Sequence, residues 1–102
     1  MSTSVFADEA FRRQSVLCDH TEEMARSIML SRQYKIGTLN ETLETISIFE
    51  EPFLTQLRKM TVDVYKSHNP IYQTAINKDQ AIKDFMAEWK SKCWATYERE
   101  LE

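Results

Sequence analysis

The sequence predicts an all-α protein, and two observations support this prediction. Glycine occurs once and proline twice in 102 residues, far below their usual shares of about 7% and 5%. The chain therefore lacks the residues that the turns of a many-stranded sheet require. Apolar residues also recur at helical spacing in three long segments. We expect three long helices in an antiparallel bundle, at roughly residues 4–36, 38–67 and 77–101.

The length and composition of the chain indicate a single helical domain over residues 1–102. Domains commonly contain about 100 to 150 residues, so the chain has no room for a second hydrophobic core. A hydrophobic content of 42% is too high for intrinsic disorder, and charged residues make up 28% of the chain. We therefore expect a folded domain with one core.

The predicted first helix has one weak point in its middle. Its apolar face carries side chains at helical spacing: Phe6, Ala10, Leu17, Met24 and Ile28. The segment CDHTEE, residues 18–23, places the capping residues Asp19 and Thr21 near the centre of this helix. A break near Cys18–Thr21 would give four helices in place of three, and the sequence leaves this alternative open.

The predicted second helix contains Pro52 in its interior. Proline removes a backbone donor and clashes with the carbonyl group four residues earlier, which favours two separate helices. The apolar positions nevertheless keep the same helical phase on both sides of Pro52. These positions are Leu39, Leu43, Ile46, Phe49, Phe53, Leu57, Met60 and Val64. We therefore expect a single helix that bends at Pro52 with its convex side toward water.

The only glycine, Gly37, lies between the first two predicted helices. Glycine readily adopts the left-handed conformation that the residue after a helix favours, and the positive charge of Lys35 suits a helix C-terminus. Thr38 and Glu41 match the T-x-x-E pattern of a capping box, in which each side chain binds a free backbone amide of the next helix. The sequence thus predicts a tight corner at Gly37–Thr38, with Gly37 in the left-handed conformation.

The predicted third helix follows a connection that interrupts helical structure. Proline at position 70 disfavours helical backbone at Asn69, and Asn77, with Gln80 three residues later, predicts that the helix begins at residue 77. Its apolar side chains form one stripe: Ile82, Phe85, Met86, Trp89, Cys93, Tyr97 and Leu101.

The two cysteines are not expected to carry chemistry. Cys18 and Cys93 lie far apart, without a CxxC pair or the spacing of a secreted disulfide framework, so we expect both to be reduced. Cys93 lies on an apolar stripe, where a cysteine usually acts as a small buried hydrophobic residue. A catalytic thiolate is therefore not expected at this position.

The densest group of potential metal ligands comprises Cys18, Asp19, His20 and the two glutamates that follow. A metal ion needs several donors that converge from fixed positions, and the only other histidine is His68. A single glycine also excludes the usual phosphate-binding loops. We expect no metal, no cofactor and no enzymatic activity.

The charge balance and the first residues of the chain limit which partners and which location we expect. Thirteen basic and sixteen acidic residues give a net charge of -3, whereas phosphate-binding proteins usually carry a concentrated basic excess. The first residues lack the pattern of a signal peptide, and no apolar stretch approaches the roughly eighteen residues of a membrane span. We expect an intracellular, cytoplasmic protein that contacts no membrane and for which nucleic acid is a disfavoured partner.

A DNA-binding helix-turn-helix motif is the main functional alternative. Residues 31–46 place a glycine at a corner, followed by Leu43 and Ile46 at plausible core positions. Gln33, however, occupies a place where such motifs prefer a small residue. The second helix of the motif would carry two glutamates and no Lys or Arg to meet phosphates. A transcriptional regulator is therefore the alternative and not the first prediction.

Several large apolar side chains lie off the main faces of the predicted helices. Long helices make a slender molecule with much surface relative to its core, and apolar side chains outside that core are typical of protein-binding surfaces. The expected contact residues are Trp94, Tyr34, Leu30, Ile48 and Val16. The sequence therefore predicts a small non-enzymatic helical interaction module. Such a module would act as an adaptor, regulator or inhibitor of a larger protein, or would associate with itself as a dimer.

Overall fold

The computed structural model describes residues 2–66 and 69–101, and this part of the chain contains four helices. They are α1 (Ser2–Gln33), α2 (Leu39–Ile46), α3 (Phe53–Val64) and α4 (Ala75–Leu101). No strand occurs among these residues, so the predicted all-α class is confirmed. Of the residues discussed above, His68 and the side chains of Phe6 and Leu101 lie outside the described part.

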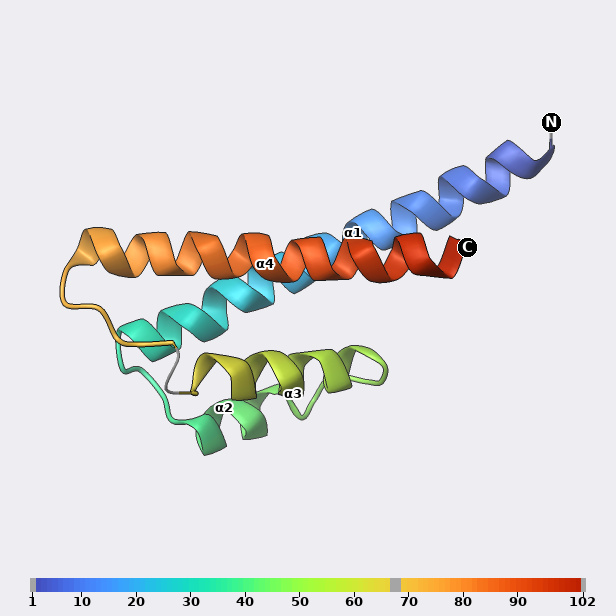
Figure 1. Cartoon of the computed structure of the whole chain (residues 1–102). Coiled ribbons are helices and arrows are strands. Elements are labelled where there is room, and N and C mark those ends of the chain that lie inside the picture. The colour runs from blue at the N-terminus through green and yellow to red at the C-terminus, as the bar shows by residue number, and fades with distance from the viewer. Residues whose placement is uncertain (1, 67–68, 102) are drawn as a thin grey trace.

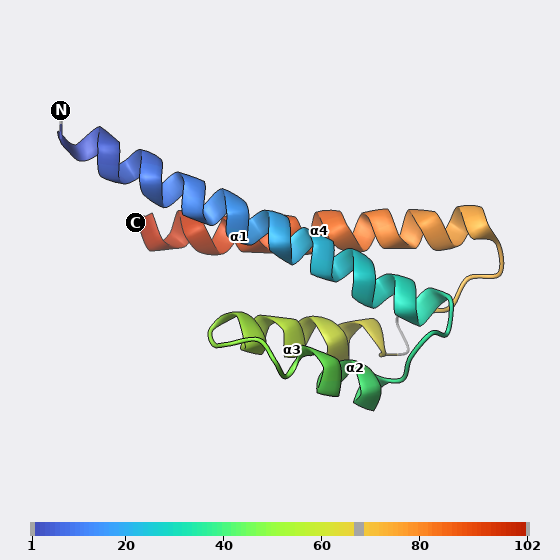
Figure 2. The same ribbon diagram turned by 180° about the vertical axis from the view of Figure 1, so that it is seen from behind.

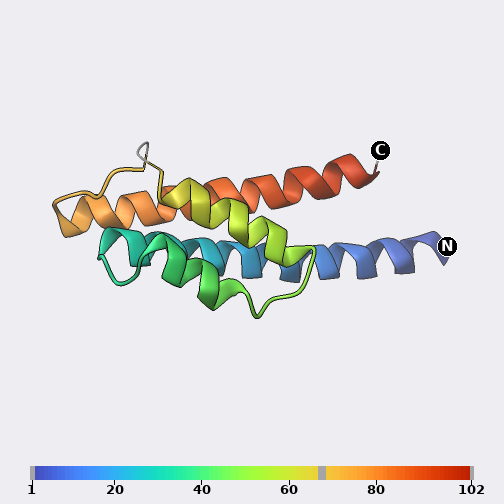
Figure 3. The same cartoon turned by 90° about the horizontal axis from the view of Figure 1, so that it is seen from below.

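The helices form one long pair and one short hairpin. Helices α1 and α4 lie side by side and run in opposite directions, so the start of α1 and the end of α4 lie at the same end of the molecule (Figures 1 and 3). The hairpin of α2 and α3 lies along the middle of this pair, and the ends of α1 and α4 nearest the N and C marks extend past it (Figure 2). The molecule measures 54 × 28 × 18 Å, with a radius of gyration of 15.5 Å. A compact domain of this length has a radius of gyration of about 13 Å, so the fold is elongated.

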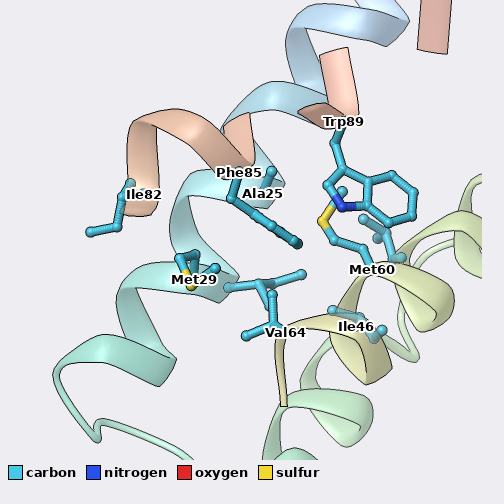
Figure 4. Close-up of a cluster of buried hydrophobic side chains, with 10 residues drawn as sticks. Ala25, Met29, Ile46, Met60, Val64, Ile82, Phe85 and Trp89 are labelled. Atoms are coloured by element: carbon cyan, nitrogen blue, oxygen red, sulfur yellow. The ribbon is translucent and has the colours of Figure 1, made fainter. Parts of the chain in front are cut away.

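The hydrophobic core lies where the hairpin covers the seam between α1 and α4 (Figure 4). All four helices contribute to it. The buried members are Ala25, Ile28 and Met29 of α1, Ile46 of α2, Leu57, Met60 and Val64 of α3, and Ile82, Phe85 and Trp89 of α4.

The prediction of a single second helix bent at Pro52 is wrong. Helix α2 ends at Ile46, and α3 begins at Phe53 after a reversal of the chain. Beyond Ile46, the Ser47 hydroxyl donates to the Glu44 carbonyl at 2.6 Å, a bond that competes with helix continuation. Pro52 would also remove a donor from a continuous helix. The apolar positions on the two sides of Pro52 share one helical phase, and this pattern suggested a single helix. A hairpin gives the same pattern, because both of its helices face one core.

The alternative break near Cys18–Thr21 is also wrong, because α1 is continuous through these residues. The hydroxyl of Thr21 donates to the Leu17 carbonyl of its own helix at 2.9 Å and does not cap a new one. The fourth helix thus comes from the break between Ile46 and Phe53. The four-helix alternative had placed the break in the first helix.

The corner after α1 is built on Lys35 and not on Gly37. Lys35 has a φ of 54°, in the left-handed region, whereas no glycine has a positive φ. The Ile36 amide donates to the Ser31 carbonyl at 2.9 Å, and the Lys35 amide donates to the Arg32 carbonyl at 3.4 Å. These two bonds form a Schellman motif with Lys35 at the position that usually holds glycine. The predicted left-handed conformation of Gly37 is therefore wrong.

The capping box that follows the corner is confirmed. The Glu41 amide donates to the Thr38 hydroxyl at 3.2 Å, and the Thr38 amide donates to the Glu41 carboxylate at 3.2 Å. Gly37 contributes through its carbonyl oxygen, which accepts a hydrogen bond from the Tyr65 hydroxyl at 3.0 Å. This bond links the corner to the end of α3.

We expect the substitution Lys35→Gly to raise the free energy of unfolding by about 0.5 to 1 kcal/mol. A left-handed conformation costs a residue with a Cβ about 1–2 kcal/mol, and the greater freedom of glycine in the unfolded chain offsets part of the gain. Urea denaturation followed by circular dichroism measures the change.

The matched control for that substitution is Gly37→Ala. A Cβ at Gly37 would meet the Thr42 hydroxyl at 3.8 Å, an ordinary contact, and the φ of Gly37 is not positive. We expect a change within about 0.5 kcal/mol. The opposite result would be a large loss of unfolding free energy from Gly37→Ala and no gain from Lys35→Gly. It would indicate that Gly37, and not Lys35, adopts the left-handed conformation.

Helix α4 begins at Ala75, two residues before the predicted start. The Asn77 amide donates to the Thr74 hydroxyl at 3.1 Å, so Thr74 caps the helix in place of Asn77. Threonine, like asparagine, is a favourable capping residue. The sequence signal was therefore of the correct kind but was assigned to the wrong residue.

Candidate protein-binding groove

A disulfide joins the two long helices near the end of the hairpin. Cys18 of α1 and Cys93 of α4 are bonded, with their Cα atoms 5.5 Å apart, a separation within the range that disulfides require. The expectation that both cysteines are reduced is therefore wrong. The two residues are 75 positions apart in the sequence, and only the opposite directions of α1 and α4 bring them together.

Beyond this disulfide, α1 and α4 continue as a two-helix arm, which we define as residues 2–17 and 94–101. The ends of α1 and α4 nearest the N and C marks extend past the hairpin (Figures 1 and 3). The Phe11 and Trp94 rings pack together with a centroid distance of 5.3 Å, and Trp94 and Tyr97 lie 5.6 Å apart. The Phe11–Trp94 contact thus joins the two helices of the arm, and Tyr97 packs against Trp94 from within α4.

An open groove of about 960 Å³ lies between the arm and the first turns of α3. Leu17 of α1, Phe53 of α3 and Trp89 of α4 supply large apolar side chains to its lining. Leu17 is 40% exposed, whereas Trp89 is 6% exposed. The groove therefore continues the apolar seam of the core out to a solvent-accessible surface.

The charged side chains of the groove lining are mainly basic. They comprise three cations, Lys59, Lys92 and Arg99, and one carboxylate, Glu98. The lining therefore carries a local net charge of +2 in a chain whose overall net charge is -3. The basic character of this surface departs from the average of the molecule.

The three cations differ in how they are held. The Lys92 ammonium lies 4.4 Å from the centre of the Trp89 ring and 3.7 Å from the Glu88 carboxylate. The Arg99 guanidinium donates to the Thr96 hydroxyl at 3.3 Å. Lys59 is exposed and pairs with no carboxylate among residues 2–66 and 69–101. At least one cation is thus free to meet an incoming acidic group.

The disulfide is part of the wall of the same groove. Cys93 and Gln14 line it, and the Gln14 amide nitrogen lies 3.3 Å from the Cys18 sulfur and 3.4 Å from the Cys93 sulfur. Cys18 is fully buried. The covalent link thus fixes the spacing of the two helices at the point where the groove begins.

The structure does not bring the five predicted contact residues into one surface. Val16, Tyr34 and Ile48 are exposed, at 55%, 45% and 80%, whereas Leu30 and Trp94 are half-buried. Val16 and Tyr34 are eighteen residues apart on or directly after α1, which corresponds to about 27 Å along a helix. Only Val16 and Trp94 belong to the arm.

The groove-lining residues were missed because the sequence placed them in the core. Leu17, Phe53 and Trp89 all lie on the apolar faces of the predicted helices, which were assumed to be covered along their whole length. A comparison of helix lengths indicates that part of the seam is left uncovered. Helix α1 has 32 residues and α3 has 12, or about 48 Å and 18 Å at 1.5 Å per residue. Because the chain breaks between Ile46 and Phe53, neither α2 nor α3 is long enough to cover the whole seam between α1 and α4.

The potential metal ligands were also compared with the described part of the structure. No group of three or more His, Cys, Asp or Glu side chains there is close enough to hold a metal ion. Cys18, one of the candidate ligands in the CDHTEE segment, has its sulfur in the disulfide. Among the same residues, no helix combines the length and the apolar character needed to cross a lipid bilayer.

No protein-family model, curated protein or solved structure matches the chain. The fold and the groove define a class only: a small all-helical protein with an open, basic-lined apolar groove beside a disulfide. Its function must be inferred from this geometry.

Proposed function

We propose that the chain is a non-enzymatic helical interaction module that binds another protein through the groove and the adjoining arm. The observation that carries this proposal is the uncovered side of the arm, where the apolar seam of the core continues past α3 into a groove of about 960 Å³. Exposed apolar grooves between helices are common docking sites for protein segments. An adaptor, regulator or inhibitor role is consistent with this binding mode.

The exposed residues Val16, Tyr34 and Ile48 and the half-buried residues Leu30 and Trp94 are secondary contact candidates. Trp94 contacts Phe11 and Tyr97, so a substitution there would also loosen the arm. Binding by an outer surface, including self-association as a dimer, would use Val16 in place of the groove. The groove is favoured because it combines apolar area with concave shape.

The disulfide bears on where the module acts. Disulfides persist mainly in oxidising environments, so the proposal places the working protein in such an environment and not in the reducing cytoplasm expected from the sequence. A membrane is not part of the proposal.

DNA binding through the corner between α1 and α2 receives less support. Helix α2 has eight residues, LNETLETI, which include two glutamates and no Lys or Arg. A DNA-binding regulator contacts phosphates through Lys and Arg, and its binding weakens steeply as salt rises. Helix α2 has no such cations.

Site-specific photocrosslinking tests the proposed function. A photoreactive residue at Gln56, which lines the groove, should capture a single polypeptide in cells that produce the protein. The matched control is Arg58, an exposed residue of the same helix that lies about 200° around the helical axis from Gln56. We expect an adduct from Gln56 and none from Arg58.

A third position, Val16, separates the groove from the outer surface of the arm. An adduct from Val16 but not from Gln56 would move the interface away from the groove and contradict the proposal. An adduct with twice the mass of the chain would identify the partner as a second copy. The absence of any adduct from all three positions would also contradict a protein-binding function.

A further inference from the structure

We infer that the groove accepts an amphipathic helix whose apolar face is bordered by Asp and Glu. This inference rests on the proposed function and specifies the chemistry of the partner. It depends on two separate features of the groove: its continuity with a helix-binding seam, and the sign of its charge.

The first feature is that the groove extends a surface on which a helix already lies. Helix α3 places Leu57, Met60 and Val64, all fully buried, against the seam between α1 and α4. The groove begins at the first turn of this helix, at Phe53 and Gln56, and continues toward the arm. The same two helices line both regions, so the element that fits beyond the end of α3 is another helix with apolar side chains on one face.

The second feature is the charge of the groove. Lys59, Lys92 and Arg99 outnumber the single carboxylate, Glu98. Long cationic side chains at the border of an apolar groove select partners with complementary charge and disfavour basic ones. A helix with Asp and Glu beside its apolar stripe would pack its apolar side chains into the groove and pair its carboxylates with the cations.

A second copy of the chain supplies this chemistry poorly. Its most acidic stretch of helix, residues 19–23, carries no exposed large apolar side chain. Ile48 is 80% exposed and lies near Glu50 and Glu51, but residues 47–52 are not helical. The inferred occupant is therefore a different polypeptide.

A displayed peptide library tests the inference on the oxidised full-length chain. Each library member is an 18-residue helix with Leu or Phe at positions i, i+3, i+4 and i+7, and with flanking positions drawn equally from Asp, Glu, Lys, Arg and Ser. We expect the bound peptides to contain at least about three times as many acidic as basic residues at the flanking positions.

A pair of double variants then assigns the preference to the groove. The variant Lys59→Gln/Arg99→Gln removes two cations of the lining, whereas Arg58→Gln/Lys83→Gln removes two exposed cations of the same two helices outside it. We expect the first variant to weaken binding of a selected acidic peptide about fivefold, and the second to change it less than twofold. All four residues are solvent-exposed, and circular dichroism checks that both variants remain helical.

Several outcomes would overturn the inference. Selected peptides without acidic enrichment, or equal weakening by the two double variants, would remove the role of the groove cations. Competition by dodecanoate, a fatty acid with one carboxylate, would identify a lipid site. A dimer that dissociates when acidic peptide is added would make a second copy the occupant. If Gln56 captures a protein whose crosslinked segment is neither helical nor acidic, the proposed function stands and this inference fails.

Discussion

Loss of the Cys18–Cys93 disulfide is expected to lower the free energy of unfolding by about 4 kcal/mol. A cross-link between residues 75 positions apart removes a large loop-closure entropy from the unfolded chain, and the loop-length relation gives about this value. Small domains are stable by about 5–15 kcal/mol. The bond therefore accounts for a large share of the stability of this elongated fold.

Urea denaturation of the native chain, with and without dithiothreitol, measures the effect. The double variant Cys18→Ala/Cys93→Ala is the control, because it should unfold at lower urea concentration and should not respond to the reductant. Two free thiols in the native purified chain, or equal stability of the oxidised and reduced forms, would contradict the expectation.

Loss of the disulfide should first increase local opening of the arm. Phe11, Trp94 and Tyr97 contact one another and are not members of the buried core cluster, whereas Ala25 and Met29 are. Local opening requires less free energy where fewer apolar groups are buried. Hydrogen exchange after reduction should therefore accelerate at residues 8–17 more than at residues 25–29.

Features that depend on near neighbours in the sequence were predicted well. Scarce glycine and proline and the apolar periodicity indicated helices, and the structure is all-helical over the described residues. The capping box of Thr38 and Glu41 requires only that two side chains lie three positions apart, and it forms as expected. These signals are local, so no knowledge of the tertiary fold was needed to read them.

Features that depend on distant segments were not predictable in the same way. The apolar phase across Pro52 is the same for a bent helix and for a hairpin, and only packing against α1 and α4 distinguishes them. The disulfide depends on the relative register of α1 and α4. The groove is a further consequence of the break at Pro52, because the hairpin that results is too short to cover the seam as far as Leu17.

The end of α1 shows how a distant segment sets a local boundary. The sequence allowed the helix to continue to residue 36, but it ends at Gln33. The Gln33 carbonyl accepts a hydrogen bond from the Lys78 ammonium at 2.5 Å, and the Gln33 side chain binds the segment that follows α3. Helix α1 therefore ends three residues earlier than expected, and the left-handed residue is Lys35, two positions before Gly37.

The substitution Gln33→Leu is expected to lower the free energy of unfolding by about 3 kcal/mol. Gln33 is 1% exposed. Its amide nitrogen donates to the Pro70 carbonyl at 2.8 Å, and its amide oxygen accepts from the Tyr72 backbone amide at 2.9 Å. Leucine would leave both backbone groups without their partner, and an unpaired buried polar group costs about 1–3 kcal/mol. Chemical denaturation measures the change.

The matched control is Gln80→Leu, which removes the same amide from the surface of α4. Gln80 is exposed and donates to the Asp84 carboxylate four residues later at 2.8 Å, a contact of a kind worth about 0.2–0.5 kcal/mol. Gln33→Leu should also speed hydrogen exchange of the Tyr72 amide, because that amide loses its acceptor. Equal losses from the two substitutions would show that the segment at residues 69–72 is held by its own packing. In that case Gln33 would not be the residue that ends α1 and attaches this segment to it.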